Sequence, residues 1–235
     1  PYTSSAASDV YKRQHLVRYV AGTSHHGICF GADCYPQHAL MDHDLSGPLE
    51  CFVDSDHAAD KDTRRSCTGY VFFSRGGPIS WRSRLQNSTA LSTTEAEFMA
   101  ASDAGCENAW LRRLIGETTN LTCTRLNGVL VPQDIAAPKL SQKFYDYEVP
   151  TKFHEDNLGC IKCSENPVLH GRMKHIDIKY HRIKEFVKNG DCILIYVNTS
   201  HQIADLLTKA LPKSTFTPLR DCLVIDPFKQ LSQSS

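Results

Sequence analysis

The stretch that decides the fold is Gly69-Tyr-Val-Phe-Phe-Ser74, which Arg-Gly-Gly joins to Pro78-Ile-Ser-Trp-Arg-Ser83. The first run is rich in aromatic and β-branched residues, and the glycine-rich turn between the two runs is typical of a β-hairpin. An earlier run at residues 50–55, Glu-Cys-Phe-Val-Asp-Ser, has a similar strand-like pattern. The chain therefore predicts three strands in quick succession.

A long helix is expected directly after this hairpin. Ser92-Thr-Thr-Glu95 forms a capping box, with Ser92 as the N-cap and Glu95 at the third helical position. We expect the helix to continue to about Glu117. Residues 118–150 then show no strong periodicity and are long for a connection inside a compact domain, so we expect an exposed loop insertion.

Strand and helix patterns alternate in the second half of the chain. Strands are expected at residues 151–155 and 192–197, and helices at about 157–166, 175–188 and 203–211. Three hairpin-connected strands followed by alternating strand and helix predict an α/β fold, in which helices cover a mixed sheet.

The two ends of the chain are expected to lie outside this core domain, which we place at residues 48–212. Residues 1–14 are rich in small polar side chains without periodicity, and predict a non-native or disordered leader. Residues 15–47 predict a short helix, a strand at 27–30 and a polar link. Residues 213–235 are expected to be a C-terminal tail.

Charge and composition narrow the possible classes of protein. The 26 basic and 26 acidic residues cancel, yet residues 61–84 and 172–188 each hold six basic side chains. These stretches fit either a surface that follows a nucleic-acid backbone or ordinary solvated faces. No apolar run approaches roughly 20 residues and no signal peptide begins the chain, which argues against a membrane or secreted protein. Ten scattered cysteines then predict reduced thiols in an intracellular protein, in a cytoplasmic particle or the nucleus.

Four acidic residues lie where this order of elements can bring them together. Asp54 is on the first strand, Glu97 in the first turns of the long helix, Asp156 at the end of the fourth strand and Asp205 on the last helix. Clustered carboxylates need cations to stay ionised, and hard oxygen ligands suit Mg²⁺ or Mn²⁺. Two such ions about 4 Å apart support in-line cleavage of a phosphodiester.

Helix geometry separates the two glutamates of this segment. Residues two apart on a helix point about 200° away from each other, so Glu95 and Glu97 cannot both face the sheet. Glu95 can cap the helix at its surface, whereas Glu97 shares its face with small apolar residues such as Ala100 and Ala101. We therefore assign Glu97 to the metal site.

Other residues allow more than one reading. Cys160 and Cys163 have a zinc-like spacing, but they stand one turn apart on a short helix and are better explained as ordinary cysteines. His201 is either a proton shuttle near Asp205 or a solvated loop residue. Trp81 and Trp110 are expected in the core rather than as platforms for nucleic-acid bases.

Several short sequence motifs resemble those of the ribonuclease H domain of copia-type retrotransposon polyproteins, and they occur in the order typical of that family. They cover roughly residues 50–117 and 152–212, and residues 18–23 resemble the preceding link to the reverse transcriptase. The matching stretches are Val53-Asp-Ser-Asp-His-Ala58, Asp62-Thr-Arg-Arg-Ser-Cys-Thr-Gly-Tyr-Val-Phe-Phe73, Gly77-Pro-Ile-Ser-Trp-Arg-Ser83, Ala90-Leu-Ser-Thr-Thr-Glu-Ala-Glu-Phe-Met-Ala100, Trp110-Leu-Arg-Arg-Leu114, Asp156-Asn157, Asn166-Pro167, Lys174-His-Ile-Asp-Ile-Lys-Tyr-His181 and Gln202-Ile-Ala-Asp-Leu-Leu-Thr-Lys209.

The resemblance implies a fold, an activity and a set of residues. The fold is a five-stranded mixed sheet, three antiparallel strands followed by two parallel ones, flanked by helices. The activity is hydrolysis of the RNA strand of RNA–DNA hybrids by two Mg²⁺ or Mn²⁺ ions, with a reverse transcriptase domain of the same polyprotein as partner. The implied catalytic and metal-binding residues are Asp54, Glu97, Asp156 and Asp205. The implied nucleic-acid contacts are Arg64, Arg65, Ser66, Asn157, Lys174 and His175.

The chain departs from the family pattern at three places. His57 stands where the family usually has Trp, Ala59 stands where it has Gly, and the link at 118–150 is longer than usual. These departures bear on activity more than on the fold. The alternative function is therefore a catalytically idle retrotransposon remnant that at most binds nucleic acid.

Overall fold

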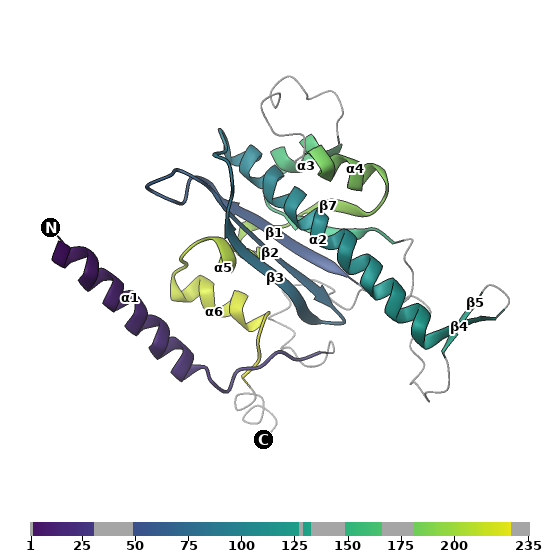
Figure 1. Ribbon diagram of the computed structural model, residues 1–235, viewed down its shortest axis with the longest axis horizontal. Coiled ribbons are helices and arrows are strands. Elements are labelled where there is room, and N and C mark those ends of the chain that lie inside the picture. Colours follow the sequence, from purple (N-terminus) through teal and green to yellow (C-terminus); the bar gives the residue numbers. More distant parts are fainter. Residues whose placement is uncertain (1, 31–48, 127–128, 133–148, 166–180, 227–235) are drawn as a thin grey trace.

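The computed structural model describes residues 2–30, 49–126, 129–132, 149–165 and 181–226 (Figure 1). Its centre is a five-stranded sheet in the order β3-β2-β1-β6-β7. The strands are β1 (Glu50–Asp56), β2 (Cys67–Ser74), β3 (Gly77–Leu85), β6 (Thr151–Glu155) and β7 (Cys192–Tyr196). β1, β2 and β3 pair antiparallel, whereas β6 pairs parallel with both β1 and β7. The mixed α/β, ribonuclease H-like sheet expected from the sequence is confirmed.

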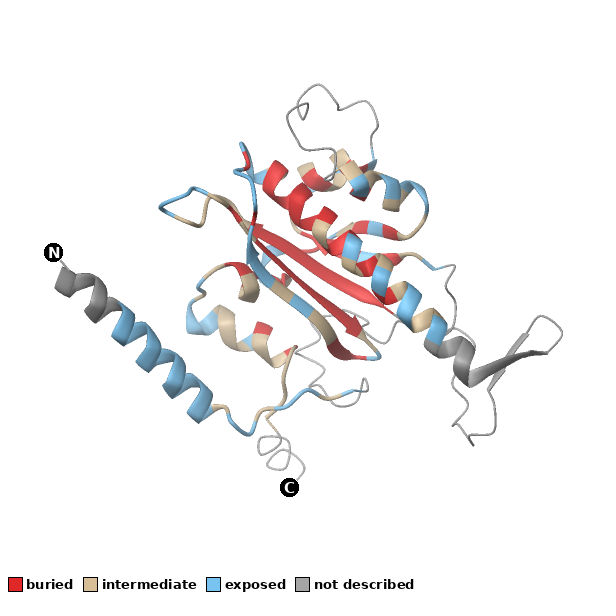
Figure 2. Ribbon diagram, viewed as in Figure 1, coloured by how far each residue is buried: buried red, intermediate tan, exposed pale blue. Residues whose placement is uncertain are grey.

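One face of the sheet is covered by a long helix, α2 (Thr93–Thr122), beside α3 (Leu158–Glu165) and α4 (Arg182–Lys188) (Figure 1). Alternate residues of β1, Cys51 and Val53, point into this layer and pack with alanines of α2. The alanines let the helix backbone approach the strands, so α2 is buried where it crosses the sheet and exposed beyond it (Figure 2).

The other face is covered by a smaller layer, in which α5 (Asp205–Thr208) and α6 (Lys213–Asp221) pack against the sheet. Phe52 and Phe73 face this layer and meet edge-to-face, with ring centroids 5.8 Å apart. Leu219 and Cys222, from α6 and its end, are buried in the same cluster. The expectation of a tail from residue 213 is therefore wrong for α6, because this helix supplies part of the second core.

The N-terminal helix is longer than expected. α1 (Tyr2–Gly22) continues through residues that the sequence assigned to a disordered leader, and its described side chains are almost all exposed (Figure 2). Tyr19 meets Phe216 of α6 edge-to-face, with ring centroids 5.9 Å apart. The helix lacks a clear apolar stripe, which is why the sequence pattern did not reveal it. Its expected non-native origin stays a prediction.

The expected loop insertion begins with regular structure. α2 runs to Thr122 rather than to Glu117, and a two-stranded hairpin follows, made of β4 (Cys123–Leu126) and β5 (Val129–Pro132). Residues 133–148 lie outside the described part of the chain. The expected link at 31–48 and the start of the helix expected at 175–188 also lie outside it.

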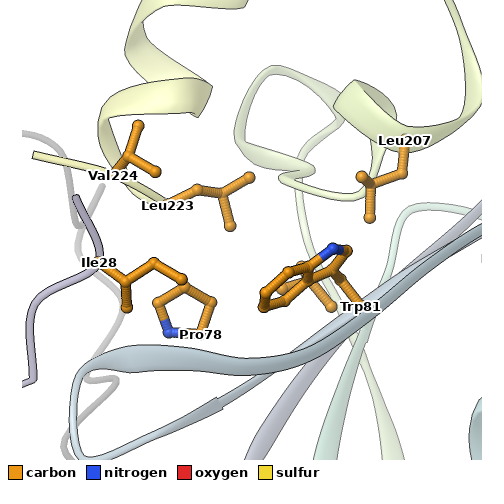
Figure 3. A pocket seen from close by; sticks show the side chains of 7 residues that line it. Ile28, Pro78, Trp81, Leu207, Leu223 and Val224 are labelled. Carbon is orange, nitrogen blue, oxygen red and sulfur yellow. The ribbon is translucent and has the colours of Figure 1, made fainter. Parts of the chain in front are cut away.

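The segment after α1 and the segment after α6 meet beside β2 and β3 of the sheet. In place of the strand expected at 27–30, Gly27 forms a single antiparallel bridge with Ile225. Beside it is an apolar pocket of about 170 Å³ (Figure 3). Trp81 contributes to its wall and is 56% exposed, so the expectation that this tryptophan lies in the core is wrong. The pocket is lined by Ile28, Val71, Pro78, Trp81, Leu207, Leu223 and Val224.

The described residues contain both free and disulfide-bonded cysteines. Seven cysteines there are free thiols, but Cys29 is disulfide-bonded, so the expectation of reduced cysteines does not hold throughout. No helix in these segments combines the length and the apolar character that crossing a membrane requires.

The burial of α6 generates a stability prediction. Leu219→Ala should lower the free energy of unfolding by about 2–5 kcal/mol, because it leaves a cavity in the second core. Ser214→Ala, at an exposed position of the same helix, is the matched control and should change it by less than about 0.5 kcal/mol. Urea unfolding of both variants measures the difference, and equal midpoints would show that α6 is the tail the sequence suggested.

Candidate metal centre

The site lies where two parallel strands of the sheet separate. β1 and β6 pair from Glu50 to Phe52 on β1, and no pairing continues beyond this point in their register. The side-chain amide of Gln202 fills the gap, donating to the carbonyl oxygens of Val53 at 2.9 Å and His154 at 3.2 Å. Gln202 is fully buried. It therefore holds the strand ends at a fixed separation, a role that the sequence did not reveal.

α5 lies unusually close to the sheet beside Asp54. The register partner of Asp54 on β2 is Gly69. A Cβ atom on Gly69 would lie 2.6 Å from Cγ2 of Thr208 and 2.9 Å from Cβ of Leu207. Only a glycine allows this approach, which lets the Thr208 hydroxyl donate to Oδ2 of Asp54. The glycine thus brings Asp205, at the start of α5, to the end of β1.

Three of the four predicted acids meet in one group. Ligand oxygens of Asp54, Asp156 and Asp205 lie within 4.8 Å of one another. Asp54 and Asp205 are buried, with 2% and 3% of their surface exposed, and Asp156 is partly exposed. Asp156 also accepts a hydrogen bond from the Thr199 hydroxyl at 2.7 Å.

The fourth predicted acid, Glu97, belongs to a second group that includes a residue not expected from the sequence. Oxygens of Glu97, Glu155 and Asp156 lie within 4.8 Å of one another, so Asp156 is common to both groups. Glu155 is fully buried, and its Oε1 accepts from the backbone N–H of Asn157 at 3.1 Å. The available signal was its place beside Asp156 at the end of a strand whose residues, apart from Lys152, are buried.

A lysine, also not singled out from the sequence, compensates part of this negative charge. Nζ of Lys209 lies 2.7 Å from Oδ1 of Asp205 and 3.8 Å from Oδ2 of Asp54. Lys209 follows Asp205 by one helical turn and stands at the end of the motif Gln202–Lys209. One ammonium group faces five carboxyl groups, so the cluster still has a large deficit of positive charge.

Burial and the lack of positive charge around these carboxyl groups raise their pKa values. Burial raises the pKa of Glu97 well above its ordinary value, and the charges of Glu155 and Asp54 raise it further. Burial likewise raises the pKa of Glu155 well above the ordinary range. Burial and the charge of Asp54 raise the pKa of Asp205 to about 7, although Lys209 opposes the shift.

The donor set fits a hard divalent cation. Both groups consist of carboxylate oxygens, which Mg²⁺ and Mn²⁺ prefer. Oε2 of Glu97 and Oε2 of Glu155 are buried and have no hydrogen-bond partner among the described residues. A buried carboxylate oxygen without a partner is costly, and a cation satisfies it. These residues can therefore hold divalent ions.

The start of α2 separates the two glutamates as expected. The Ser92 hydroxyl accepts from the backbone N–H of Glu95 at 3.1 Å, and Oε2 of Glu95 accepts from the N–H of Leu91 at 2.9 Å. Glu95 is 7% exposed, so it caps the helix from a buried position rather than from the helix surface. Glu97 points to the acids and Glu95 to the helix end.

The predicted nucleic-acid contacts are only partly beside the acids. Ser66 is fully buried, and its hydroxyl accepts from the N–H of Ala58 at 3.1 Å, which makes it a structural residue of the β1–β2 connection. Arg64 is exposed on that connection with a φ of 56°, and Arg65 is partly exposed. Asn157 caps α3 by accepting from the N–H of Cys160 at 3.0 Å. Lys174 and His175 lie outside the described residues.

The cysteine pair, two histidines and a tryptophan were the other residues considered from the sequence. Cys160 is buried and Cys163 is partly buried. Two of the downstream histidines that a zinc site would need, at positions 170 and 175, lie outside the described residues, so both readings of this cysteine pair stay open. His57, at a departure from the family pattern, makes a 3.2 Å hydrogen bond to the carbonyl of Ala90. Trp110 is 54% exposed, so its expected place in the core is wrong. His201 is partly exposed, and its two readings stay open.

The raised pKa of Asp205 predicts how stability depends on pH. Its pKa is about 7 in the folded protein against an ordinary 3.8, so the folded state holds the proton more tightly. This contribution is complete below about pH 4 and is lost as the pH rises through about 7. Metal-free protein should lose stability over this range, and Mg²⁺ should raise the melting temperature more at about pH 8 than at about pH 5.

Asp205→Asn should reduce both effects, whereas Asp62→Asn, at an exposed position of the β1–β2 connection, should leave them unchanged. Differential scanning calorimetry with and without Mg²⁺ measures them. The same Mg²⁺ effect at both pH values would contradict the assignment.

Comparisons with known proteins find relatives among the polyproteins of transposons. No family model matches the chain. The retrovirus-related Pol polyprotein from transposon TNT 1-94 of Nicotiana tabacum is 36% identical over 202 residues, which cover 86% of this chain and 12% of that protein. The corresponding polyproteins from transposons RE1 and RE2 of Arabidopsis thaliana are 32% and 31% identical over 201 residues, covering 86% of this chain and 11% of theirs. The chain thus spans about a tenth of the length of these relatives. Along most of its length it is homologous to retrovirus-related Pol polyproteins of transposons.

Proposed function

We propose that this chain is the ribonuclease H-type endonuclease part of a copia-type retrotransposon polyprotein. The reaction is hydrolysis of the RNA strand of an RNA–DNA hybrid during reverse transcription. The observation that carries the proposal is the set of five carboxyl groups gathered where β1 and β6 separate. The homology to Pol polyproteins supports the same assignment, and a reverse transcriptase domain of the same polyprotein would be the partner.

The two carboxylate groups suggest positions for two ions. Asp54, Asp156 and Asp205 would hold one Mg²⁺ or Mn²⁺, and Glu97, Glu155 and Asp156 the other. When bound, such ions supply an activated water and stabilise the leaving oxygen of a phosphodiester. Glu155 extends the set of four acids expected from the sequence by one carboxylate.

The chain's own residues would orient the substrate around this centre. The β1–β2 connection begins three residues after Asp54, and Lys61 and Arg64 are exposed on it. These cations are placed to contact phosphates beside the acids, and such contacts weaken with salt. Lys209 would hold positive charge at Asp54 and Asp205 until the ions arrive.

The alternative is a catalytically idle remnant that at most binds nucleic acid. His57 in place of the family's usual Trp and the long segment after α2 favour this reading. The set of acids and its positioning contacts favour an active enzyme. Gln202, Gly69 and Thr208 hold the acids together in buried positions, an arrangement that is costly for the fold unless it binds cations.

Cleavage of a labelled substrate tests the proposal. With Mg²⁺, the protein should cut the RNA strand of a hybrid and leave duplex DNA intact, because enzymes of this type read the 2′-hydroxyl in the minor groove. Asp54→Asn should abolish cutting, since a neutral amide cannot offset two divalent charges. The control, Asp62→Asn, should cut normally. Hybrid binding without cleavage by the unmodified protein would establish the idle alternative, and equal cutting of both duplexes would reject the assignment.

The two glutamates of α2 provide a sharper test. Glu97→Gln should remove nearly all cleavage with little change in stability, because burial raises the pKa of Glu97 and already disfavours its charged form in metal-free protein. Glu95→Gln should keep cleavage and lose at most about 1 kcal/mol of stability, since glutamine can still cap the helix. Cleavage rates and melting curves of both variants decide between them. An inactive Glu95 variant beside an active Glu97 variant would mean that the wrong face of α2 was assigned to the site.

A further inference from the structure

A second group of metal-ligating side chains lies away from the acids, where the segment after α1 meets the segment after α6. His25 and His26 follow α1 directly, and Asp226 follows the end of α6 by five residues. The backbones are joined next to them: the N–H of Gly27 donates to the carbonyl of Ile225 at 3.1 Å, and the reverse bond is 2.9 Å. In an antiparallel pair this bridge sets His26 opposite Asp226, so the ligand positions are fixed by main-chain bonds.

The distances between these side chains are near those that separate the ligands of one metal ion. Nε2 of His25 lies 3.3 Å from Oδ1 of Asp226, and Nε2 of His26 lies 3.8 Å from its Oδ2. One ligand atom from each of the three residues falls within 4.8 Å of the others. Ligand atoms about 2.0–2.1 Å from a tetrahedral Zn²⁺ lie about 3.3 Å apart, so only small adjustments are needed.

We propose that His25, His26 and Asp226 bind one Zn²⁺ ion, which ties the segment after α1 to the segment after α6. Two imidazoles and one carboxylate are a donor set suited to Zn²⁺ and poorly suited to Mg²⁺, which prefers oxygen ligands alone. Three protein ligands leave the fourth position for water. The site is independent of the proposed nuclease activity, because it shares no residue with the acidic groups.

Ordinary ion pairing explains the arrangement less well. A single protonated histidine satisfies one carboxylate, whereas here two adjacent imidazoles face the same one. Their rings lie edge-to-face with centroids 4.8 Å apart, a distance at which two protonated rings repel each other. Two neutral imidazoles can instead offer their lone pairs to one cation while the carboxylate neutralises part of its charge.

The surroundings set a limit on the affinity. Nδ1 of His26 is buried and has no hydrogen-bond partner among the described residues, so it lacks the outer hydrogen bond that strengthens histidine ligands. The positive charge of Arg220 also acts on His26, although its guanidinium donates two hydrogen bonds to Asp221. We therefore expect weaker binding than in a fully supported site, by about 10–100-fold.

Binding of Zn²⁺ to the full chain tests the proposal. Titration calorimetry in saturating Mg²⁺, which occupies the carboxylate cluster, should find one Zn²⁺ per chain. His25→Ala and Asp226→Asn should each weaken binding by at least about 10-fold. His15→Ala removes an exposed histidine of α1 and should bind as the unmodified chain does. His25 is about one-third exposed, so its variant is expected to fold, which melting curves check.

Two further readouts identify the ligands and the effect. Co²⁺ in place of Zn²⁺ should give visible absorption without the intense near-ultraviolet bands of thiolate ligands, which distinguishes this site from the free cysteines. Zn²⁺ should raise the melting temperature of the unmodified chain but not of the two site variants. Unchanged Zn²⁺ affinity in both site variants, or thiolate bands with Co²⁺, would overturn the proposal, whatever the outcome of the cleavage assays.

Discussion

Mutual repulsion among carboxyl groups is the constraint on which the rest of the structure depends. Asp54, Glu97, Glu155 and Asp205 are buried at the ends of β1 and β6, and Lys209 is the counter-charge beside them. Burying charge that is only partly compensated is expensive, and in metal-free protein the cost appears as raised pKa values of the acids despite the ion pairs of Lys209. The fold therefore has to hold in place a cluster that does not stabilise it. Such a cluster gains its favourable energy only with cations, which is the physical argument for a metal-dependent function.

Three contacts of different kinds hold the carboxylate cluster in position. They are a side-chain bridge between two strands, a close approach of a helix to a strand, and a helix cap. Gln202 replaces the missing hydrogen bonds where β1 and β6 separate. Gly69 removes the side chain that would keep α5 from β2. The Ser92 cap starts α2 at the residue that directs Glu97, and not Glu95, toward the sheet. These contacts explain why three features that are far apart in the sequence lie close together in the fold. They are a parallel strand pair that ends early, a glycine in a buried strand and a capping box.

The order of strands and helices along the chain and the start of α2 were predictable because local patterns determine them, whereas the set of four acids came from the family resemblance. The hairpin turn, the capping box and the position of each acid on its element require no knowledge of distant contacts. Glu155 was missed for the opposite reason: only the approach of α2 and α3 buries it, and sequence alternation cannot show which neighbours a strand end will meet. Trp81 and Trp110 were assigned to the core from their size, yet both are more than half exposed. For α6, the sequence shows Leu219 and Cys222 but not the open sheet face that they cover.

Trp81 is half exposed because it borders an apolar pocket that the segments after α1 and after α6 partly cover. Trp81 and Pro78 form the floor of an apolar pocket whose walls come from Ile28 and Leu223, so residues before β1 and after α6 cover the same side of the sheet (Figure 3). The segment after α1 and the segment after α6 have to stay together for this pocket to keep its walls. One backbone bridge between Gly27 and Ile225 is a weak connection for that purpose. A metal ion held by residues on both sides of the bridge would fix the two segments to each other and so keep Ile28 and Leu223 at the walls of this pocket.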